Sequence, residues 1–384
     1  MLISHRIALD PNNEQATYFA KACGVARFAY NWALAQWQQQ YEAHKADITL
    51  PRPSEMALRK QLNDIKADQF PWMLEVTKNA PQQAIKNLGT AFKRFFSGKG
   101  KYPRFKKKGQ HDSFRADGGT DKKHPTAVEV IDQQIKLPII GWVRMRESLR
   151  FKGNIKSAIV SRTADKWFVS LTVEVEHIVP VRENQAATGV DLGVSNLTTM
   201  SDGSTISGHK ALRSNLSRLN RLSRSLSRKV KGSANSRKAK AKIARLHARI
   251  ANIRSDTLHK LTTELVKLYT VIAIEDLNVR GMMANNRLAR SISDMGFFEF
   301  RRQLQYKAAM YGSLVIVVDS WFPSSKTCSS CGAVVEKLPL SVREWTCQSC
   351  GIHHDRDVNA AKNLMKFAVS STVTACGEES SGLG

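Results

Sequence analysis

The sequence predicts a multidomain α/β protein, with a small β-rich domain that carries inserted helices and a mixed-sheet domain that carries a zinc-binding insertion. Three observations predict this fold class. Residues 12–96 keep apolar side chains at helical spacing, residues 127–175 hold short β-branched runs, and residues 187–320 alternate buried strands with helices. The length of 384 residues allows two or three such domains.

The first expected elements are a strand, "ISHRIALD", and a helix that begins near Asn12. The apolar positions of this helix recur at helical spacing, which is typical of a core-facing stripe. They are Tyr18, Ala22, Val25, Ala29, Trp32 and Ala33. Because the strand precedes the helices, we expect it to pair with the later β-rich segment, so that the helices form an insertion.

A basic and aromatic segment, "AFKRFFSGKGKYPRFKKKG", closes the helical region. Basic groups neutralise phosphates and aromatic rings stack on bases, so their interleaving suits a nucleic-acid surface. The candidate contacts here are Lys93, Arg94, Arg104 and Lys106. The alternative is a solvated run of charge beside buried phenylalanines.

The next segment changes to strands. The runs "AVEVI", "QIKLP", "SAIVSRT" and "KWFVSLTVEVE" are short, β-branched and partly alternating, as in a small barrel or sandwich. The stretch "HIVPVRENQAAT" that follows is interpreted as a linker.

A basic helical hairpin is predicted over residues 209–254. Leucine and isoleucine mark two helices, and "KGSANS" provides the turn between them. From Lys210 to Arg249 the hairpin carries fourteen Lys and Arg and no acid. Paired helices of a coiled coil usually mix signs on their flanks, so cations alone indicate binding to a phosphate backbone.

The whole chain is strongly basic, with 59 Lys and Arg against 33 Asp and Glu and a net charge of +26. A polyanion relieves such self-repulsion, so nucleic acid is the first expected partner and an anionic membrane the second. The apolar runs fall far short of the ~18 residues of a spanning helix, and charge comes too early for a signal peptide. We therefore expect a cytoplasmic protein with reduced cysteines and no membrane partner.

Four of the six cysteines form two C-x2-C pairs separated by fifteen residues, namely Cys328, Cys331, Cys347 and Cys350. Two close pairs of thiolates can close a tetrahedron around zinc. Because sulfur fills all four positions, the site is expected to be structural, with no open position for water. His353 and His354 are then neighbours rather than ligands, and Cys23 and Cys376 receive no role.

Acids stand within one strand and at the end of another, and both strands are expected to be buried. Asp191 interrupts "GVDLGV", and Glu275 directly follows "VIAI". Buried charges need partners, and a divalent cation is one way to hold several carboxylates together. The third acid is Asp355 or Asp357, and we favour Asp357 because it continues the apolar stripe of the following helix by one turn.

Three carboxylates on a mixed sheet suit two Mg²⁺ or Mn²⁺ ions, which activate a water and stabilise the leaving oxygen in phosphodiester cleavage. From composition alone, helix caps and ion pairs are an open alternative for these acids. The motifs in which they lie carry further information.

Five ordered motifs, "GVDLGVSNLTTMSDG", "AIEDLNVRGM", "WFPSSKTCSSCG", "REWTCQSCGIHHDRDVNAAKNL" and "ACGEESSG", resemble the TnpB (OrfB) proteins of bacterial insertion sequences. That family comprises compact relatives of type V CRISPR effectors. The resemblance extends to "RFAYNWAL" and "YPRFKKKG" and so covers most of the chain. It implies an RNA-guided DNA endonuclease with a RuvC-like, RNase H-type domain.

The resemblance also implies a division of the chain. Residues 1–10 and 111–180 correspond to a β-barrel wedge domain, and residues 11–110 to a helical recognition domain. A RuvC-like domain over residues 186–320 and 353–370 is interrupted by a zinc ribbon, residues 321–352. The tail, residues 371–384, is expected to be disordered.

By the same resemblance, Asp191, Glu275 and Asp357 are the catalytic, magnesium-binding acids, and the four cysteines are the zinc ligands. The segment "VTKNAPQQAIKNL" resembles the part that reads a short motif beside the target, which suggests Lys78 and Gln82. The implied partners are a guide RNA from the transposon end, double-stranded target DNA and the RNA–DNA heteroduplex, bound by a monomeric ribonucleoprotein on the bacterial nucleoid.

Three other functions are compatible with parts of the sequence. A nuclease-inactive RNA-guided repressor would have lost an acid, yet all three acids are present. A transposase that joins DNA strands could use a similar acidic triad. A simple zinc-ribbon DNA-binding protein would leave most of the chain unexplained.

Overall fold

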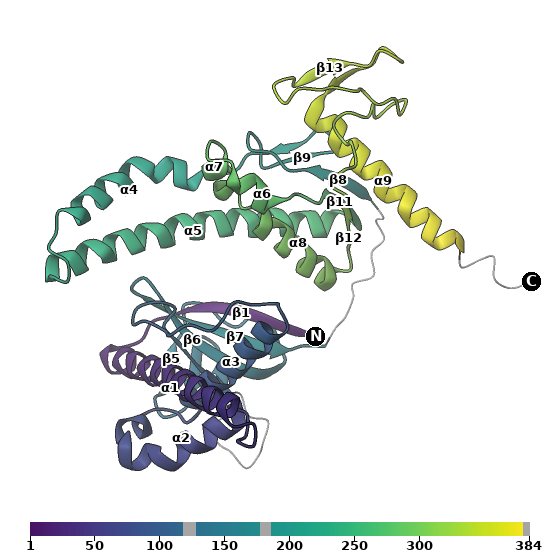
Figure 1. Ribbon diagram of the computed structural model, residues 1–384. Coiled ribbons are helices and arrows are strands. Elements are labelled where there is room, and N and C mark those ends of the chain that lie inside the picture. The colour runs from purple at the N-terminus through teal and green to yellow at the C-terminus, as the bar shows by residue number, and fades with distance from the viewer. Residues whose placement is uncertain (118–127, 177–185, 379–384) are drawn as a thin grey trace, which may run out of the picture. The chain divides into compact units, whose positions relative to one another are not determined.

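The computed structural model describes residues 1–117, 128–176 and 186–378 (Figure 1). The chain divides into two compact units, residues 1–177 and 178–384. Most of the expected linker, residues 177–185, lies outside the described residues. Across the described ranges, no helix is long and apolar enough to cross a membrane.

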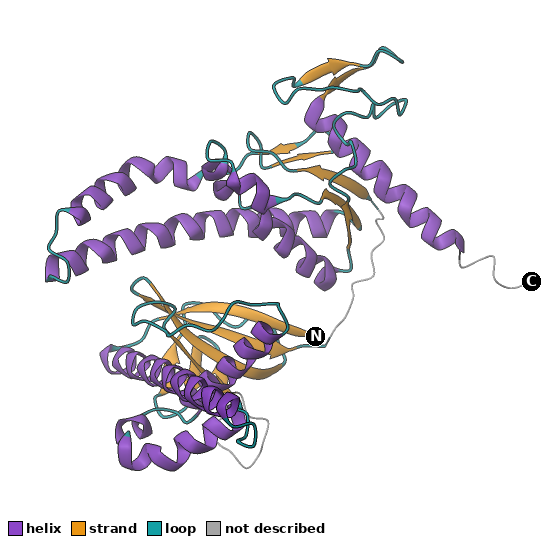
Figure 2. Ribbon diagram, viewed as in Figure 1, coloured by secondary structure: helices purple, strands orange, loops and turns teal. Residues whose placement is uncertain are grey.

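The first unit is built on a four-stranded antiparallel sheet in the order β1-β7-β6-β2 (Figure 2). Its strands are β1 (Leu2–Leu9), β2 (Ser113–Asp117), β6 (Asn154–Thr163) and β7 (Lys166–Glu174). Strand β1 pairs with β7 along its whole length, from Leu2 opposite Glu174 to Leu9 opposite Trp167. The expectation that the first strand joins the later β-rich segment is confirmed.

A second, three-stranded sheet adjoins the end of β1. It consists of β3 (Glu129–Ile131), β4 (Gln134–Leu137) and β5 (Gly141–Arg144). Leu9 forms a β-bridge with Met145, and the Asp10 N–H donates to the Arg144 carbonyl at 2.8 Å. Strand β1 therefore connects the two sheets, as a small barrel requires.

Three α-helices and a short 3-10 turn lie between β1 and β2. They are α1 (Asn13–Ala46), α2 (Glu55–Gln69), the turn Pro71–Glu75 and α3 (Asn79–Phe96). Asn12 and Gln15 form a capping box at the start of α1, which satisfies backbone donors that the helix leaves open. Phe19 of α1 packs its ring against Phe114 and Trp167 of the sheet, so the apolar face of the helix joins the core.

The second unit is built on a five-stranded sheet in the order β10-β9-β8-β11-β12. Its strands are β8 (Ala187–Asp191), β9 (Thr198–Met200), β10 (Thr205–Ile206), β11 (Val271–Glu275) and β12 (Leu314–Val318). Strands β8, β11 and β12 are parallel, and β9 runs antiparallel to β8. This is the mixed sheet that the sequence predicts.

Helices cover both faces of this sheet (Figure 1). One face packs on α5 (Ala234–Leu268) and α8 (Phe297–Tyr311), and the other on α9 (Arg356–Glu378). Helix α4 (Ala211–Ser227) pairs with the first part of α5 as the expected hairpin. Helix α5 continues beyond the expected hairpin, residues 209–254, because an apolar stripe through Leu258, Leu261 and Leu265 carries it into the core.

Two short helices, α6 (Val279–Ala284) and α7 (Ala289–Met295), occupy the polar segment between β11 and α8. A small hairpin of β13 (Glu344–Thr346) and β14 (His353–Asp355) extends the expected zinc ribbon beyond residue 352. Helix α9 extends to Glu378 and so enters the tail, residues 371–384, that was expected to be disordered. Residues 379–384 lie outside the described range.

Candidate functional site

Two acids meet at one edge of the second unit's sheet. Asp191 is the last residue of β8 and Glu275 the last of β11. The two strands are parallel neighbours, with Val190 opposite Ile274. Because the carboxyl ends of parallel strands lie at the same edge, both carboxylates are brought there by the topology.

The alternation of side chains sets the direction of both acids. Val190 and Ile274 pack in the core under α5 and α8, whereas Ala273 packs with Leu364 of α9. Side chains two residues apart share a face of a strand. Glu275 therefore points to the face that α9 covers, and so does Asp191, which lies two residues beyond the closely packed Gly189.

Helix α9 lies unusually close to β8. A Cβ atom placed on Gly189 would lie 2.7 Å from the backbone nitrogen of Met365 and closer still to the Ala361 carbonyl oxygen. Glycine is therefore required at this point of β8. The buried Ala360 and Ala361 form the matching surface of the helix.

The first turn of α9 carries the third acid. Asp355 caps the helix, since its Oδ1 accepts the N–H groups of Asp357 and Val358 at 2.9 and 2.8 Å. Asp355 is exposed, whereas Asp357 is half-buried and its Oδ1 lies 3.3 Å from Nη1 of Arg343. Asp355 therefore serves as the helix cap, and Asp357 is the aspartate of this turn that faces the site.

Electrostatics link the three carboxylates. Burial, followed by the charges of Asp357 and Glu275, raises the pKa of Asp191 to about 7, and the charges of Arg356 and Arg343 act in the opposite direction. Burial also raises the pKa of Glu275. Mutually repelling oxygen ligands at one edge form a site suited to a hard divalent cation.

The four predicted cysteines form a compact cluster. Their sulfur atoms all lie within 4.8 Å of one another. In the described ranges, no other group of three or more possible metal ligands is this compact, and Asp191, Glu275 and Asp357 do not form such a group either. Two of the sulfur pairs, Cys328–Cys350 and Cys331–Cys347, are 3.6 and 3.7 Å apart. Zn–S bonds of about 2.3 Å in a tetrahedron place sulfurs about 3.8 Å apart, so the cluster fits zinc.

Each C-x2-C pair is followed by a glycine in the left-handed region. Gly332 and Gly351 have φ of +81° and +74°, and their N–H groups donate to the carbonyls of Cys328 and Cys347. Backbone N–H groups of Cys350 and Ser349 point at the Cys347 sulfur and lower the pKa of its thiol to about 6. Cys347 therefore favours the thiolate, the form that binds metal, whereas burial and the neighbouring thiols raise the pKa of Cys350 to about 12.

The histidines of this region are neighbours of the cluster. Buried His354 lies with Nε2 3.1 Å from the Cys328 sulfur and packs against Trp345. Exposed His353 contacts the Thr346 hydroxyl through Nδ1 at 3.1 Å. Neither belongs to the four-sulfur set, and their assignment as neighbours rather than ligands stays a prediction.

Two buried asparagines of α9, which the sequence analysis did not identify, hold the first cysteine knuckle. Asn359 accepts the Ser329 N–H at 2.8 Å and donates to the Thr327 carbonyl at 2.7 Å. Asn363 donates to the Thr327 and Ser324 carbonyls at 2.6 and 2.8 Å. The helix that carries Asp357 is thus bound directly to the metal-binding knuckle.

In the first unit, Lys78 and Gln82 line a cavity of about 160 Å³ between α2 and α3. Arg59, Asn63 and Lys66 of α2 contribute to the same wall. The two residues suggested for reading a motif are therefore neighbours in a polar, basic cavity.

The other four candidate contacts lie at the end of α3 and in the segment that follows. Lys93 and Arg94 occupy the last turn of α3, whereas Arg104 and Lys106 lie in the irregular segment between α3 and β2. The Lys106 ammonium lies 4.2 Å above the Tyr30 ring, and burial lowers its pKa.

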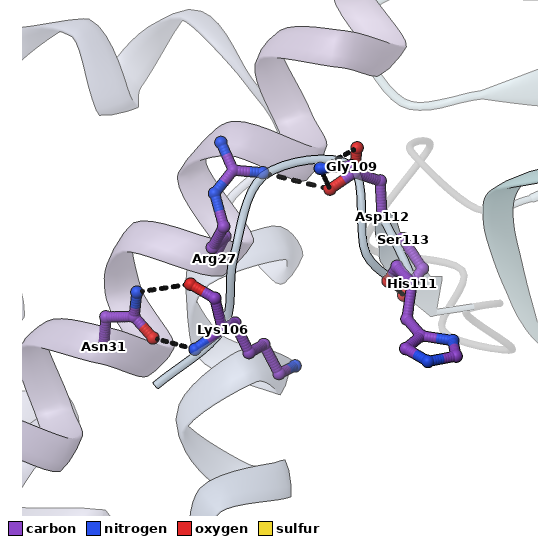
Figure 3. A network of polar contacts seen from close by, with 7 residues as sticks. All are labelled: Arg27, Asn31, Lys106, Gly109, His111, Asp112 and Ser113. Atoms are coloured by element: carbon purple, nitrogen blue, oxygen red, sulfur yellow. Dashed lines mark hydrogen bonds and ion pairs between the residues drawn. The ribbon is translucent and has the colours of Figure 1, made fainter. Parts of the chain in front are cut away.

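The segment after α3 is fastened to α1 (Figure 3). The Asn31 amide donates to the Lys106 carbonyl at 3.0 Å and accepts its N–H at 2.8 Å. Arg27 pairs with Asp112 at 3.0 Å, and the Asp112 carboxylate accepts the Gly109 N–H. The exposed basic side chains of this segment therefore stand on a fixed backbone.

The remaining cysteines are unlike the metal-binding set. Cys23 is buried in α1, and burial raises the pKa of its thiol to about 12. Cys376 lies in the last turns of α9, outside the described side chains.

Three family models match the chain. Residues 170–286 match OrfB_IS605, described as "Probable transposase". Residues 297–364 match the "Cas12f1-like, TNB domain", and residues 1–46 match the "Helix-turn-helix domain" of OrfB_IS605. In the structure, residues 1–46 hold β1 and α1.

Curated relatives align over nearly the whole chain. A Streptomyces pristinaespiralis protein named "Putative RNA-guided DNA endonuclease" is 40% identical, covering 96% of this chain and 89% of its own. The Escherichia coli protein "Putative RNA-guided DNA endonuclease InsQ" is 36% identical, with coverages of 98% and 94%.

A solved structure has the same fold. The Cas12f1 protein in a complex with sgRNA and target DNA matches with a TM-score of 0.60 and 16% identity, covering 92% of this chain and 83% of that one. With the sequence relatives and the two matched OrfB models, these findings show that the chain belongs to the TnpB (OrfB) family of insertion-sequence proteins.

Proposed function

We propose that the chain is an RNA-guided DNA endonuclease that cuts target DNA by Mg²⁺-dependent hydrolysis. The observation that supports this most is the placement of Asp191, Glu275 and Asp357 at one sheet edge, where burial, followed by the charges of Asp357 and Glu275, raises the pKa of Asp191 to about 7. Relatives that align over most of the chain carry the name RNA-guided DNA endonuclease.

The three carboxylates are suited to hold Mg²⁺ or Mn²⁺, since both ions prefer oxygen ligands. Two such ions, when bound, supply an activated water and stabilise the leaving oxygen. Asp191 and Glu275 supply ligands from adjacent strands, and Asp357 supplies one from the helix above them. Arg343, which contacts Asp357, offsets part of their negative charge.

The four cysteines would hold a structural zinc ion. Their sulfurs leave no position open to water, so this ion takes no part in the reaction. Its effect is to fix the ribbon, and Asn359 and Asn363 transmit that fixed position to α9.

The basic surfaces would bind the nucleic acids. A net charge of +26 suits a guide RNA and its heteroduplex with target DNA, in which base pairing reads the sequence. We assign Lys78 and Gln82 to a short motif beside the target, and the segment after α3 to phosphate contacts. One copy of the chain with one guide RNA would act on DNA in the bacterial cytoplasm.

The proposal is tested with the purified protein and the RNA that copurifies with it. That RNA is sequenced, and plasmids with a matching target and a randomised flank are offered with Mg²⁺. We expect cleavage that requires both the match and a short flanking motif. Asp191→Asn should abolish cleavage but retain target binding, whereas Asp202→Asn, at an exposed turn, should cut normally.

The same experiment separates the alternatives. Because one matched family model is described as "Probable transposase", the products are also examined for joined strands. RNA-independent joining would replace the proposal with strand transfer. Guided binding without cleavage by the wild-type protein would replace it with an RNA-guided repressor.

A further inference from the structure

Trp321 is the most exposed large apolar side chain in the described ranges, with 91% of its surface accessible. Single exposed apolar side chains are common on protein surfaces, so exposure alone decides nothing. The ring is distinguished by its position near the acids and by the fixed backbone that holds it.

Trp321 lies just after β12, the strand that pairs with β11 and its last residue, Glu275. In the pairing of β11 with β12, Glu275 lies opposite Val318, the last residue of β12. Trp321 comes three residues later, beyond the same edge of the sheet. Val318 packs with Ala273 under α9, so the chain leaves the sheet beside the face to which the acids point.

The backbone around Trp321 is fixed on both sides. The Trp321 N–H donates to Oδ1 of Asp319 at 2.7 Å. The next ring, Phe322, packs against Phe367 of α9 with ring centroids 5.3 Å apart, and Asn363 holds the Ser324 carbonyl at 2.8 Å. Phe322 therefore anchors the turn while its neighbour presents an indole to solvent.

The acidic centre and its ions can hold the scissile phosphate, but the rest of the strand needs other contacts. Carboxylates without bound metal repel phosphates, and Arg343 beside them is paired with Asp357. An aromatic face binds a base of any sequence by stacking and adds no charge to the site. An indole held on a rigid turn also loses little conformational entropy when it binds.

We propose that Trp321 stacks on a nucleobase of the single DNA strand whose backbone reaches Asp191 and Glu275. This inference rests on the proposed nuclease function and adds a substrate-binding residue to it. The contact positions the strand without reading its sequence, so it acts on every target alike.

The test uses the full protein–guide RNA complex in an Asp191→Asn background, which blocks cutting. Target DNA carries one 2-aminopurine at successive positions around the cut site. We expect stacking on Trp321 to quench the probe at one position or a few neighbouring ones. Trp321→Ala should remove that quenching, and Trp321→Tyr should restore it.

Cleavage with an intact Asp191 provides the second measurement. Trp321→Ala should raise KM for DNA about tenfold, and Trp321→Tyr should recover most of the loss. Melting temperatures should stay unchanged because the side chain is exposed. Phe298→Ala is the matched control, since this ring is 70% exposed on α8, the helix on the opposite face of the sheet.

The outcomes are distinguishable. If wild-type protein cuts matched DNA but Trp321→Ala cuts and quenches like wild type, the role of Trp321 is overturned. Equal losses with Ala and Tyr also overturn it, because stacking needs only an aromatic ring. If wild-type protein fails to cut matched DNA at all, the proposed nuclease function fails instead.

Discussion

In the proposed mechanism, the protonation state of Asp191 decides whether the sheet edge can bind metal. Burial and the charges of Asp357 and Glu275 raise its pKa to about 7. Metal ligands must be ionised, so Mg²⁺-dependent cleavage should rise about tenfold per pH unit below about pH 7 and level off above it. Single-turnover rates across this range measure the profile. A rate independent of pH would contradict the assignment.

The contribution of Asp191 to folding stability depends on pH in the direction opposite to that of cleavage. Its proton is held more tightly in the folded state than in the unfolded chain, where the pKa is about 3.9. The carboxyl therefore favours folding most at low pH, and this contribution is lost as pH rises toward 7. Asp357→Asn removes the neighbouring charge that has the larger effect on Asp191 and should lower the pKa of Asp191, as a carboxyl NMR titration of the metal-free protein would show.

Arg343 acts on the same titration from the zinc ribbon. Its positive charge lowers the pKa of Asp191, so Arg343→Gln should move the pH profile of cleavage to higher pH. The shift should be small because the guanidinium is more than half exposed and screened by water. Arg343→Lys should keep most of the profile, and Lys337→Gln, at an exposed ribbon cation, should leave it unchanged. An unshifted profile in Arg343→Gln would remove Arg343 from the site.

The candidate acids can be chosen from the sequence more readily than the residues that hold them in place. Asp357 can be chosen over Asp355 because the helix period is local information. The ion pair of Arg343 with Asp357 and the hydrogen bonds of Asn359 depend on how the ribbon folds back on α9. Asn359 reaches Ser329, thirty residues earlier in the chain, and no local pattern marks such a partner.

Among the elements, α9 joins the two candidate metal sites. Asn363→Ala would remove its hydrogen bonds to the Ser324 and Thr327 carbonyls and leave the Thr327 carbonyl to Asn359 alone, which costs about 0.5–1.5 kcal/mol per lost hydrogen bond. We expect zinc to bind but to be released to a chelator faster than in wild type, and cleavage to fall with it. Zinc release followed with a colorimetric chelator tests this.

Lys362→Ala is the control for the α9 clamp, since Lys362 adjoins Asn363 but is exposed. Unchanged zinc release in Asn363→Ala would show that the knuckle is held by other contacts. Full cleavage by zinc-free protein would contradict the coupling itself, because the ribbon would then not be needed to place Asp357.

The closeness of α9 to β8 depends on Gly189. Gly189→Ala would drive a methyl group into the backbone of α9, which cannot rotate away, so we expect a loss of at least about 1–3 kcal/mol and a displaced Asp357. Gly24→Ala is the matched control, because the nearest atom, Nη2 of Arg27, is 3.9 Å away and alanine favours the helix by about 0.5–1 kcal/mol. Thermal unfolding measures both. Equal stability of the two variants would contradict the close packing.

The type of an element was predictable where the apolar periodicity extends over many residues. The end of an element was predictable where a glycine or proline interrupts the pattern. The strand "VIAIE" and the first helix follow from pattern alone, and both are found. The end of α5 was not predictable, because no glycine or proline interrupts residues 254–268. Helices α6 and α7 are too short for a period to be recognised.

At the scale of the whole molecule, the excess charge is concentrated where the sequence predicts it. The exposed arginines of α4 have no acid on their own hairpin, since residues 210–249 contain none. Charge that no acid neutralises is available to phosphates, and each neutralised phosphate releases counterions. The hairpin should therefore dominate the salt dependence of RNA binding rather than the stability of the fold.

The salt dependence of guide RNA binding tests this directly. Replacing Arg218, Arg221 and Arg224 of α4 by glutamine should reduce the slope of log K against log salt by about 2–3, because each lost phosphate contact removes roughly 0.7–0.9. Lys260→Gln is the control, since Lys260 of α5 is already paired with Asp256 at 2.8 Å. Thermal unfolding should be unchanged in both, as all four side chains are exposed. If the triple variant keeps the wild-type slope, the hairpin faces solvent in the complex, and the RNA must lie on other basic surfaces such as the segment after α3.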